Sequence, residues 1–243
     1  MKNLSVLMIT TSHDALGNTG EKTGVWLEEL AAPYYKFSKE NANITIASPK
    51  GGAIPLDPKS ELNEWQTEYT RQFNNDPKAL EAIKNSKKIS EIQASDFDVL
   101  FFPGGHGPMW DLSDNTEIAK IVNSFNKESK PIGLVCHGVA ALKGVIENGV
   151  PFVKGRKLTS FTNSEEEAVQ LTDVVPFLLE TALINEGAIY HKGEDWSEFV
   201  IEDENLITGQ NPQSSVKTAQ KTLDYIKIKG YLTALKYLET TNY

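Results

Sequence analysis

Four short apolar runs constrain the fold of this chain most strongly. They occupy residues 6–9, 44–47, 99–102 and 132–135. Runs of this length and composition are typical of strands that are buried on both faces of a sheet. Segments with helical spacing lie between them, notably residues 23–40 and 118–126. This alternation predicts an α/β fold in which a mostly parallel sheet is sandwiched by helices.

Three of the four runs end in residues that suit a binding site. The first leads to residues 10–13 (Thr-Thr-Ser-His), the third to residues 103–107 (Pro-Gly-Gly-His-Gly) and the fourth to residues 136–138 (Cys-His-Gly). Ligands of open parallel sheets bind beyond the carboxyl ends of the strands. We therefore expect the three segments to meet at one edge of the sheet.

The length of the chain, 243 residues, suits a single α/β domain spanning residues 1–243. Residues 51–88 are polar, contain three prolines and include two weakly amphipathic pieces. We interpret this stretch as an insertion that forms a flap or small helical cap on that domain. Near the end of the chain, residues 216–226 are predicted to form a helix, with a shorter helix after Gly230.

Composition excludes several functions. Lys plus Arg number 24 and Asp plus Glu number 33, so the net charge is −9 and nucleic-acid binding is not expected. The single cysteine excludes an intrachain disulfide and any cysteine-rich metal site, and a lone thiol suits a reducing compartment. No run approaches the ~20 apolar residues of a membrane span. We expect a cytoplasmic protein without membrane contact.

Cys136 lies between a buried strand and the small-residue turn Cys-His-Gly-Val-Ala-Ala. The thiolate is the reactive form of cysteine, and a helix N-terminus lowers the pKa of a thiol. The arrangement resembles a nucleophile elbow, although the residue two positions before the cysteine is Leu134 instead of glycine. A free cysteine is most often a small buried hydrophobic residue. The strand–Cys–His–Gly context favours a nucleophile, with His137 as an adjacent base or acid.

The turn formed by Gly104, Gly105 and His106 follows another predicted strand. Glycines let backbone N–H groups approach a ligand and form a hollow that binds anions. We interpret these three residues as an oxyanion and substrate-binding turn, and a plain tight turn is the alternative.

Glu29 lies at the edge of the apolar stripe of the helix predicted over residues 23–40, whereas Glu28 points to solvent. A carboxyl at the margin of a buried face must be paired, protonated or functional. Beside a thiolate it would resist ionising, so we expect a raised pKa and a proton shared with Cys136. A structural salt bridge is an equally good interpretation from this pattern alone.

The segment Ser164-Glu165-Glu166-Glu167 fits a capping box, with Ser164 as the N-cap and Glu167 at the third helical position. Glu165 and Glu166 are then acids of the first turn, which the helix dipole favours. Nothing local separates Glu166 from its neighbours.

Five motifs carry a resemblance to a known family. They are Thr-Gly-Val-Trp-Leu-Glu-Glu-Leu (23–30), Phe-Pro-Gly-Gly-His-Gly (102–107), Val-Cys-His-Gly (135–138), Phe-Thr-Asn-Ser-Glu-Glu (161–166) and Thr-Gly-Gln-Asn-Pro-Gln-Ser (208–214). With these motifs the chain resembles the ThiJ/PfpI superfamily, which is related to class I glutamine amidotransferase domains and has a flavodoxin-like fold. It is most similar to the branch of stress-inducible, chaperone-like proteins that includes glutathione-independent glyoxalase III.

The resemblance implies roles for individual residues. Cys136 becomes the nucleophile, His137 its partner and Glu166 the acid that orients the histidine. Glu29 becomes the carboxylate that touches the sulfur, while Gly105 and His137 supply backbone oxyanion donors. Some larger relatives carry a His/Glu metal site. The four histidines of this chain, at 13, 106, 137 and 191, do not suggest a matching ligand cluster, so no metal and no cofactor are predicted.

The resemblance also implies an activity: conversion of methylglyoxal to lactate through a cysteine hemithioacetal. Protein deglycase activity, a stress-protective role, glycated or unfolded protein clients and a homodimer are further expectations of the same kind. Two other functions stay open. One is a cysteine amidase or peptidase, and the other is a holdase chaperone or oxidation sensor.

Overall fold

A central sheet of seven strands organises the chain. The computed structural model describes residues 3–241, and side chains as far as residue 230. The strand order is β10-β11-β5-β4-β1-β2-β3. The strands are β1 (Ser5–Ile9), β2 (Asn43–Ser48), β3 (Lys87–Lys88), β4 (Val99–Phe102), β5 (Ile132–Val135), β10 (Val200–Asp203) and β11 (Leu206–Gly209). Neighbouring strands are parallel except β10 and β11. The predicted α/β fold with a mostly parallel sheet is confirmed.

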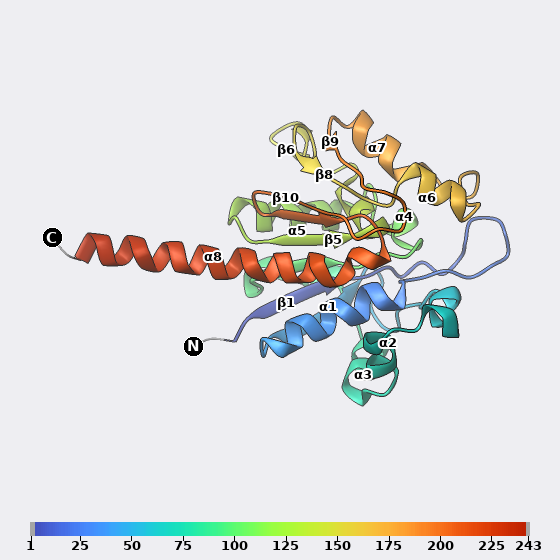
Figure 1. Ribbon diagram of the computed structural model, residues 1–243, viewed down its shortest axis with the longest axis horizontal. Helices are drawn as coiled ribbons and strands as arrows, with labels where there is room; N and C mark the ends of the chain where they lie inside the picture. The colour runs from blue at the N-terminus through green and yellow to red at the C-terminus, as the bar shows by residue number, and fades with distance from the viewer. Residues whose placement is uncertain (1–2, 242–243) are drawn as a thin grey trace.

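Helices cover both faces of this sheet. On one face α1 and α8 lie side by side, and α5 covers the other (Figure 1). Two small sheets, β6–β7 and β8–β9, lie outside the main one. The remaining elements are α1 (Leu27–Lys39), α2 (Glu68–Asn74), α3 (Pro77–Lys84), α4 (Pro108–Asp111), α5 (Thr116–Lys127), α6 (Asn163–Ala168), α7 (Leu179–Asn185), α8 (Ser215–Thr241), β6 (Ile146–Glu147), β7 (Val150–Pro151), β8 (Lys157–Leu158) and β9 (Ile189–Tyr190).

Two hydrophobic cores lie on opposite faces of the sheet, and strands β1, β2, β4 and β5 contribute side chains to both of them. Val6 and Met8 of β1 pack under α1 and α8, whereas Leu7 and Ile9 pack with the helices of the other face. Alternate side chains of a strand point to opposite faces, so a strand covered on both sides cannot alternate with polar residues. This is why a continuous apolar run predicted each of these strands.

The polar stretch 51–88 forms short helices below α1 in Figure 1. Thr67 and Asp76 cap α2 and α3 with their side chains, and the stretch ends in β3, which extends the main sheet beside β2. The Thr67 hydroxyl also donates to the carboxyl of Glu28. Glu28 was expected in solvent, and that expectation was wrong because the inserted helices cover it. Burial raises the pKa of Glu28 to about 7.

Two helix boundaries differ from the sequence-based expectation. Helix α1 begins at Leu27 instead of residue 23, because Val25 is held in extended backbone by a bridge to Leu56. Helix α8 continues through Gly230 as one element whose far end extends beyond the sheet (Figure 1). A single glycine inside a helix costs only about 1 kcal/mol, which is too little to end a long helix. Among the described residues, no helix is long and apolar enough to span a membrane.

Candidate active site

Cys136 is the first residue after β5 and opens the 3-10 segment Cys136–Leu142. Its φ angle is 57°, in the left-handed region that residues other than glycine rarely adopt. Such strain at a strand end is the hallmark of a nucleophile elbow, which turns the side chain out of the sheet toward a site. Cys136 is nevertheless only 3% exposed.

His137 connects the cysteine to Glu166. Its Nδ1 lies 3.4 Å from the Cys136 sulfur, and its Nε2 lies 2.6 Å from Oε2 of Glu166. Burial lowers the pKa of His137, so the imidazole is neutral at pH 7. Burial opposes ionisation of Glu166, but His137 and His106 outweigh it and hold the Glu166 pKa well below its usual range. The ionised carboxylate accepts the Nε2–H of His137, which leaves the Nδ1 lone pair facing the thiol.

His106 is a second histidine on the same carboxylate. Its Nε2 lies 2.8 Å from Oε1 of Glu166, and its ring centroid is 4.1 Å from that of His137. The sequence placed His106 in the substrate-binding turn, but its bond to Glu166 was not foreseen. His106, His137 and Glu166 bring three possible metal ligand atoms within 4.8 Å of one another, a cluster that the sequence did not lead us to expect. These atoms are already paired by the two hydrogen bonds.

Glu29 is fully buried beside Cys136. Its Oε2 accepts the Gly104 N–H at 2.8 Å, and its Oε1 has no regular hydrogen-bond partner among the described residues. Burial raises the Glu29 pKa to about 8, although the Cys136 thiol and the Gly104 N–H pull it down. Glu29 is therefore mostly protonated at pH 7 and can give or take a proton beside the sulfur.

The electrostatics of Cys136 differ from the expectation. Burial raises the pKa of the thiol, the nearby Glu29 carboxyl raises it further, and the His137 backbone N–H lowers it. The sequence suggested that a helix N-terminus would lower this pKa, but loss of solvation outweighs the backbone N–H. The thiol is neutral at rest and needs a base when it attacks. A buried thiol with a raised pKa also disfavours the oxidation-sensor hypothesis.

The two glycines of the turn after β4 differ in what their backbone N–H groups contact. The Gly104 N–H donates to Glu29 and is therefore not available to a ligand, although Gly104 was placed in the oxyanion and substrate-binding turn. Gly105 has a φ of 93°, lines the cavity above Cys136, and its N–H has no acceptor among the described residues. Gly105 is thus the backbone donor that a developing oxyanion could use.

Replacing Gly104 tests how tightly this turn is built. A Cβ there would lie 2.5 Å from Glu29 Oε2, 2.7 Å from the Val135 oxygen and 2.8 Å from the His137 nitrogen. We expect Gly104→Ala to lower the free energy of unfolding by about 1–3 kcal/mol and turnover by roughly 10²-fold. Urea unfolding and steady-state kinetics measure the two effects.

The matched control is Gly230→Ala in α8, because among the described residues no heavy atom outside its own helix lies within 4 Å of that Cβ position. It should stabilise the protein by about 0.5–1 kcal/mol and leave turnover unchanged. Equal behaviour of the two variants would mean that Gly104 is not close-packed against the site.

A cavity of about 70 Å³ lies over Cys136. Three of the four tryptophans of the chain line it, together with Phe161: they are Trp26, Trp65 and Trp196. Glu29, Gly105, His106, Cys136, His137, Val169 and Pro212 complete the lining. Trp65 comes from the inserted stretch 51–88, and its ring stands edge-on to Trp26 at 5.5 Å. These aromatic walls carry no local sequence signal and were missed.

The strand end after β1 does not reach this cavity, contrary to expectation. His13 stacks on Trp110 at 4.9 Å, and its Nε2 lies 2.6 Å from the Ala15 oxygen. Thr11 donates to Asp111 at 2.7 Å. Residues 10–13 therefore support the glycine turn from outside, since Thr11 also lies close to Gly107.

Helix α6 carries Glu166 and begins two residues earlier than the capping box predicted. Thr162 is the N-cap, and Glu165 returns the capping hydrogen bond. The assignment of Ser164 and Glu167 to these positions was wrong, because the box forms two residues earlier: the Thr162 hydroxyl accepts the Glu165 N–H, and the Glu165 carboxyl accepts the Thr162 N–H. This two-residue shift turns Glu166 toward the histidines.

The fold and this constellation define the class of the protein: the chain belongs to the DJ-1/PfpI family, which it matches over residues 22–225. Glyoxalase 3 of Candida albicans is 30% identical over 232 residues, covering 90% of this chain and 96% of that relative. The glutathione-independent glyoxalase HSP31 of Saccharomyces cerevisiae is 26% identical over 91% of this chain and 97% of its own length.

A solved structure is also similar to this chain along most of its length. The Rapid Encystment Protein 24 KDa of Francisella tularensis is 42% identical and superposes with a TM-score of 0.88, covering 91% of this chain and 98% of its own. The match to the DJ-1/PfpI family confirms the predicted superfamily.

Proposed function

We propose that the protein is a glutathione-independent glyoxalase that converts methylglyoxal to lactate. One observation carries the proposal: Cys136, His137 and Glu166 form a hydrogen-bonded chain at the base of a small aromatic cavity, with protonated Glu29 beside the sulfur. Two relatives with this activity in their names support it, and both are covered almost completely by the chain.

The reaction would begin with addition of the thiol to the aldehyde of methylglyoxal. His137 Nδ1 takes the thiol proton as the C–S bond forms, and protonated Glu29 gives its proton to the carbonyl oxygen to complete a hemithioacetal. The Gly105 N–H can stabilise the negative charge on that oxygen during the addition. Glu166 holds the resulting imidazolium in place.

Proton transfer between adjacent carbons would follow. Glu29, ionised by the preceding step, removes the hydrogen on the former aldehyde carbon to give an enediolate, and then returns that proton to the neighbouring carbon. The product is a lactoyl thioester on Cys136. Glu29 suits this step because a pKa of about 8 lets it accept and release a proton near neutral pH. Water then hydrolyses the thioester, which releases lactate and restores the thiol without an external cofactor.

Steady-state loss of methylglyoxal in glutathione-free buffer tests the proposal. We expect many turnovers per protein molecule. The amidase hypothesis predicts ammonia release from glutamine or cleavage of a labelled peptide instead. Turnover of those substrates, without loss of methylglyoxal, would overturn the glyoxalase assignment.

Glu29 provides a stability prediction whose sign follows from its pKa. Burial raises that pKa from 4.5 to about 8, so the folded state binds this proton more tightly than the unfolded state does. Stability contributed by such a group is full below pH 4.5 and is lost as pH rises to about 8. Glu29→Gln removes this loss. We expect the variant to exceed wild type by about 1–3 kcal/mol at pH 8 and by much less at pH 5.

Urea unfolding at both pH values measures the difference, and turnover is expected to fall about 10–10²-fold in the same variant. Glu167→Gln, on the exposed side of α6, is the control for a surface carboxyl. The same stability difference at pH 5 and pH 8 would contradict a buried, protonated Glu29.

Several expectations from the sequence stay predictions. They are a single domain with a cap formed by residues 51–88, a cytoplasmic location, a homodimer, and activity on glycated or unfolded protein clients. Holdase activity is tested separately with a client-aggregation assay on Cys136→Ala. Unchanged holdase activity in that variant would separate it from the glyoxalase chemistry.

A further inference from the structure

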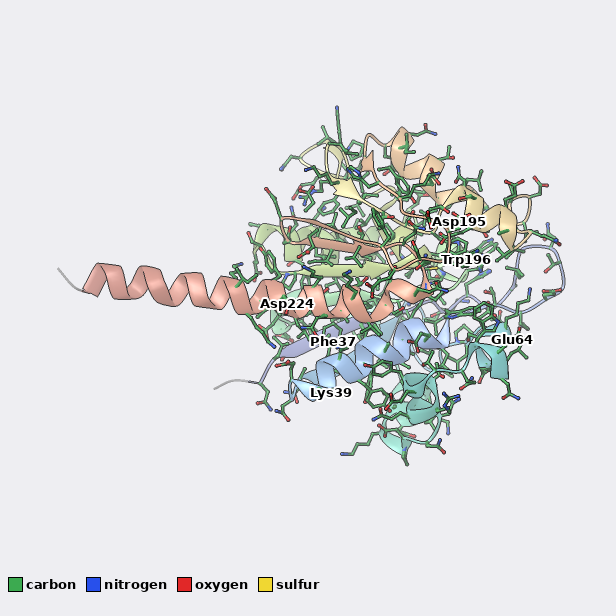
Figure 2. All side chains as sticks on the ribbon, viewed as in Figure 1. Phe37, Lys39, Glu64, Asp195, Trp196 and Asp224 are labelled. Carbon is green, nitrogen blue, oxygen red and sulfur yellow. The ribbon has the colours of Figure 1, made fainter. Side chains whose placement is uncertain are left out.

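Trp196 has an unusual backbone for a wall of the cavity. Its φ angle is 60°, a left-handed conformation that is strongly disfavoured for a large side chain. The residue is 37% exposed, and its indole stands edge-on to Phe161 at 5.7 Å between ring centroids. Phe161 in turn lies 4.4 Å from the ring of His137. Figure 2 shows Trp196 beside Asp195 at the end of the molecule where α6 lies. A backbone conformation this unfavourable persists only where neighbouring contacts stabilise it.

The Glu165 carboxyl provides that anchor. Its Oε1 accepts a hydrogen bond from the backbone N–H of Trp196 at 2.9 Å. The same oxygen accepts from the side-chain amide groups of Asn211 at 2.8 Å and Gln210 at 3.1 Å. Its Oε2 accepts the backbone N–H of Thr162 at 3.0 Å and the hydroxyl of the same residue at 3.1 Å. Glu165 is fully buried, and these five hydrogen bonds satisfy both oxygens. A carboxyl this completely paired can stabilise a strained neighbour.

Further bonds tie the same loop to the rest of the site. Ser164 donates to Asp195 at 2.6 Å, and Asn211 donates to the Ser197 oxygen at 2.8 Å. The Gly193 N–H donates to Gln210 Oε1 at 2.9 Å. The loop that carries Trp196 is therefore held on both sides, from the start of α6 and from the segment after β11.

We propose that Glu165 positions Trp196 as the wall that limits which carbonyl compounds reach Cys136, admitting short aliphatic α-ketoaldehydes and rejecting aryl ones. The substrate class rests on the proposed glyoxalase function, whereas the size limit concerns access to the thiol. The cavity over Cys136 is small, and Trp196 is one of the four aromatic side chains that line it, so a bulky aryl group on the substrate meets this wall before a methyl group would. Glu165 is a positioning residue because it touches Trp196 and not the substrate.

Alkylation of Cys136 tests the size limit without reference to turnover. Cys136 is the sole cysteine, so mass spectrometry of the intact protein reports its modification directly. Trp196→Gly removes the indole, and glycine adopts the left-handed backbone without strain. We expect N-phenylmaleimide to react about tenfold or more faster with this variant than with wild type, while iodoacetamide changes less than about threefold.

Two further variants separate positioning from general loosening. Glu165→Gln has one carbonyl oxygen for two sets of donors, so it should raise the N-phenylmaleimide rate in the same direction and by a smaller factor. Trp196→Phe keeps an aromatic ring at this position, so it should react with N-phenylmaleimide more slowly than Trp196→Gly does and faster than wild type does. Trp110→Phe, on the His13 side and outside the lining of this cavity, should leave both rates unchanged. Equal acceleration of both reagents, or no change in Trp196→Gly, would overturn the proposal.

Steady-state kinetics then test whether access to the Cys136 thiol also decides which α-ketoaldehyde the protein turns over. We expect Trp196→Gly to raise the ratio of kcat/KM for phenylglyoxal over that for methylglyoxal about tenfold. If wild type turns over neither compound, the proposed function fails, and the alkylation rates still decide whether Trp196 limits access. If wild type is active and the ratio does not change, the assignment of substrate size to Trp196 is wrong.

Discussion

Cys136→Ala is expected to lower methylglyoxal turnover by roughly 10³-fold or more, to the level of the buffer. The reaction as proposed passes through two covalent states on the sulfur, so no other side chain in the cavity can replace it. Cys136 is buried and its side chain is small, so the variant should fold. Steady-state kinetics in glutathione-free buffer and urea unfolding on the same preparations give the two measurements.

Cys136→Ser is the informative companion. It keeps a hydroxyl beside His137 Nδ1, yet an alcohol is a much weaker nucleophile toward this aldehyde and a poorer leaving group afterwards. Both variants should therefore be inactive. Activity of either one within about tenfold of wild type would show that the sulfur forms no covalent intermediate.

Glu166→Gln is expected to lower kcat by about 10²–10⁴-fold with little change in KM. Glu166 accepts the Nε2–H groups of both His137 and His106. A glutamine has one acceptor oxygen, and its amide group can only donate. At least one histidine must then lose its bond or change tautomer. If His137 changes tautomer, its Nδ1 carries a proton and cannot take one from the thiol.

Glu167→Gln, the next residue along α6, is the matched control because its side chain is exposed. It should retain wild-type kcat and stability. A Glu166→Gln variant with full kcat would contradict the role of this carboxylate in orienting His137. A loss confined to KM would mean that Glu166 acts on substrate binding.

Local patterns predicted the parts of the fold that depend on local physics. Residues 99–102 and 132–135 coincide with β4 and β5, because strands buried on both faces must be apolar throughout. Cys136 and the glycine turn were found by the same route, since the carboxyl ends of adjacent parallel strands meet. Glu29 followed from helical phase, even though α1 starts later than expected.

The rest of the site depends on contacts between distant segments. Glu166 could not be separated from Glu165 by any local rule, and the start of α6 was misplaced because Glu165 is buried by Gln210 and Asn211 from the far end of the chain. The bond between His106 and Glu166 spans 60 positions of sequence. A rise in the Cys136 pKa likewise follows from burial, which no motif reports.

The carbon balance of the reaction tests the central claim most directly. Wild-type protein is incubated with a large molar excess of methylglyoxal in glutathione-free buffer, and methylglyoxal and lactate are quantified together over time. We expect one lactate for each methylglyoxal consumed, over many turnovers of each Cys136 thiol. Loss of methylglyoxal that stops at about one equivalent per thiol, with no lactate formed, would show that Cys136 is only alkylated and would contradict the account.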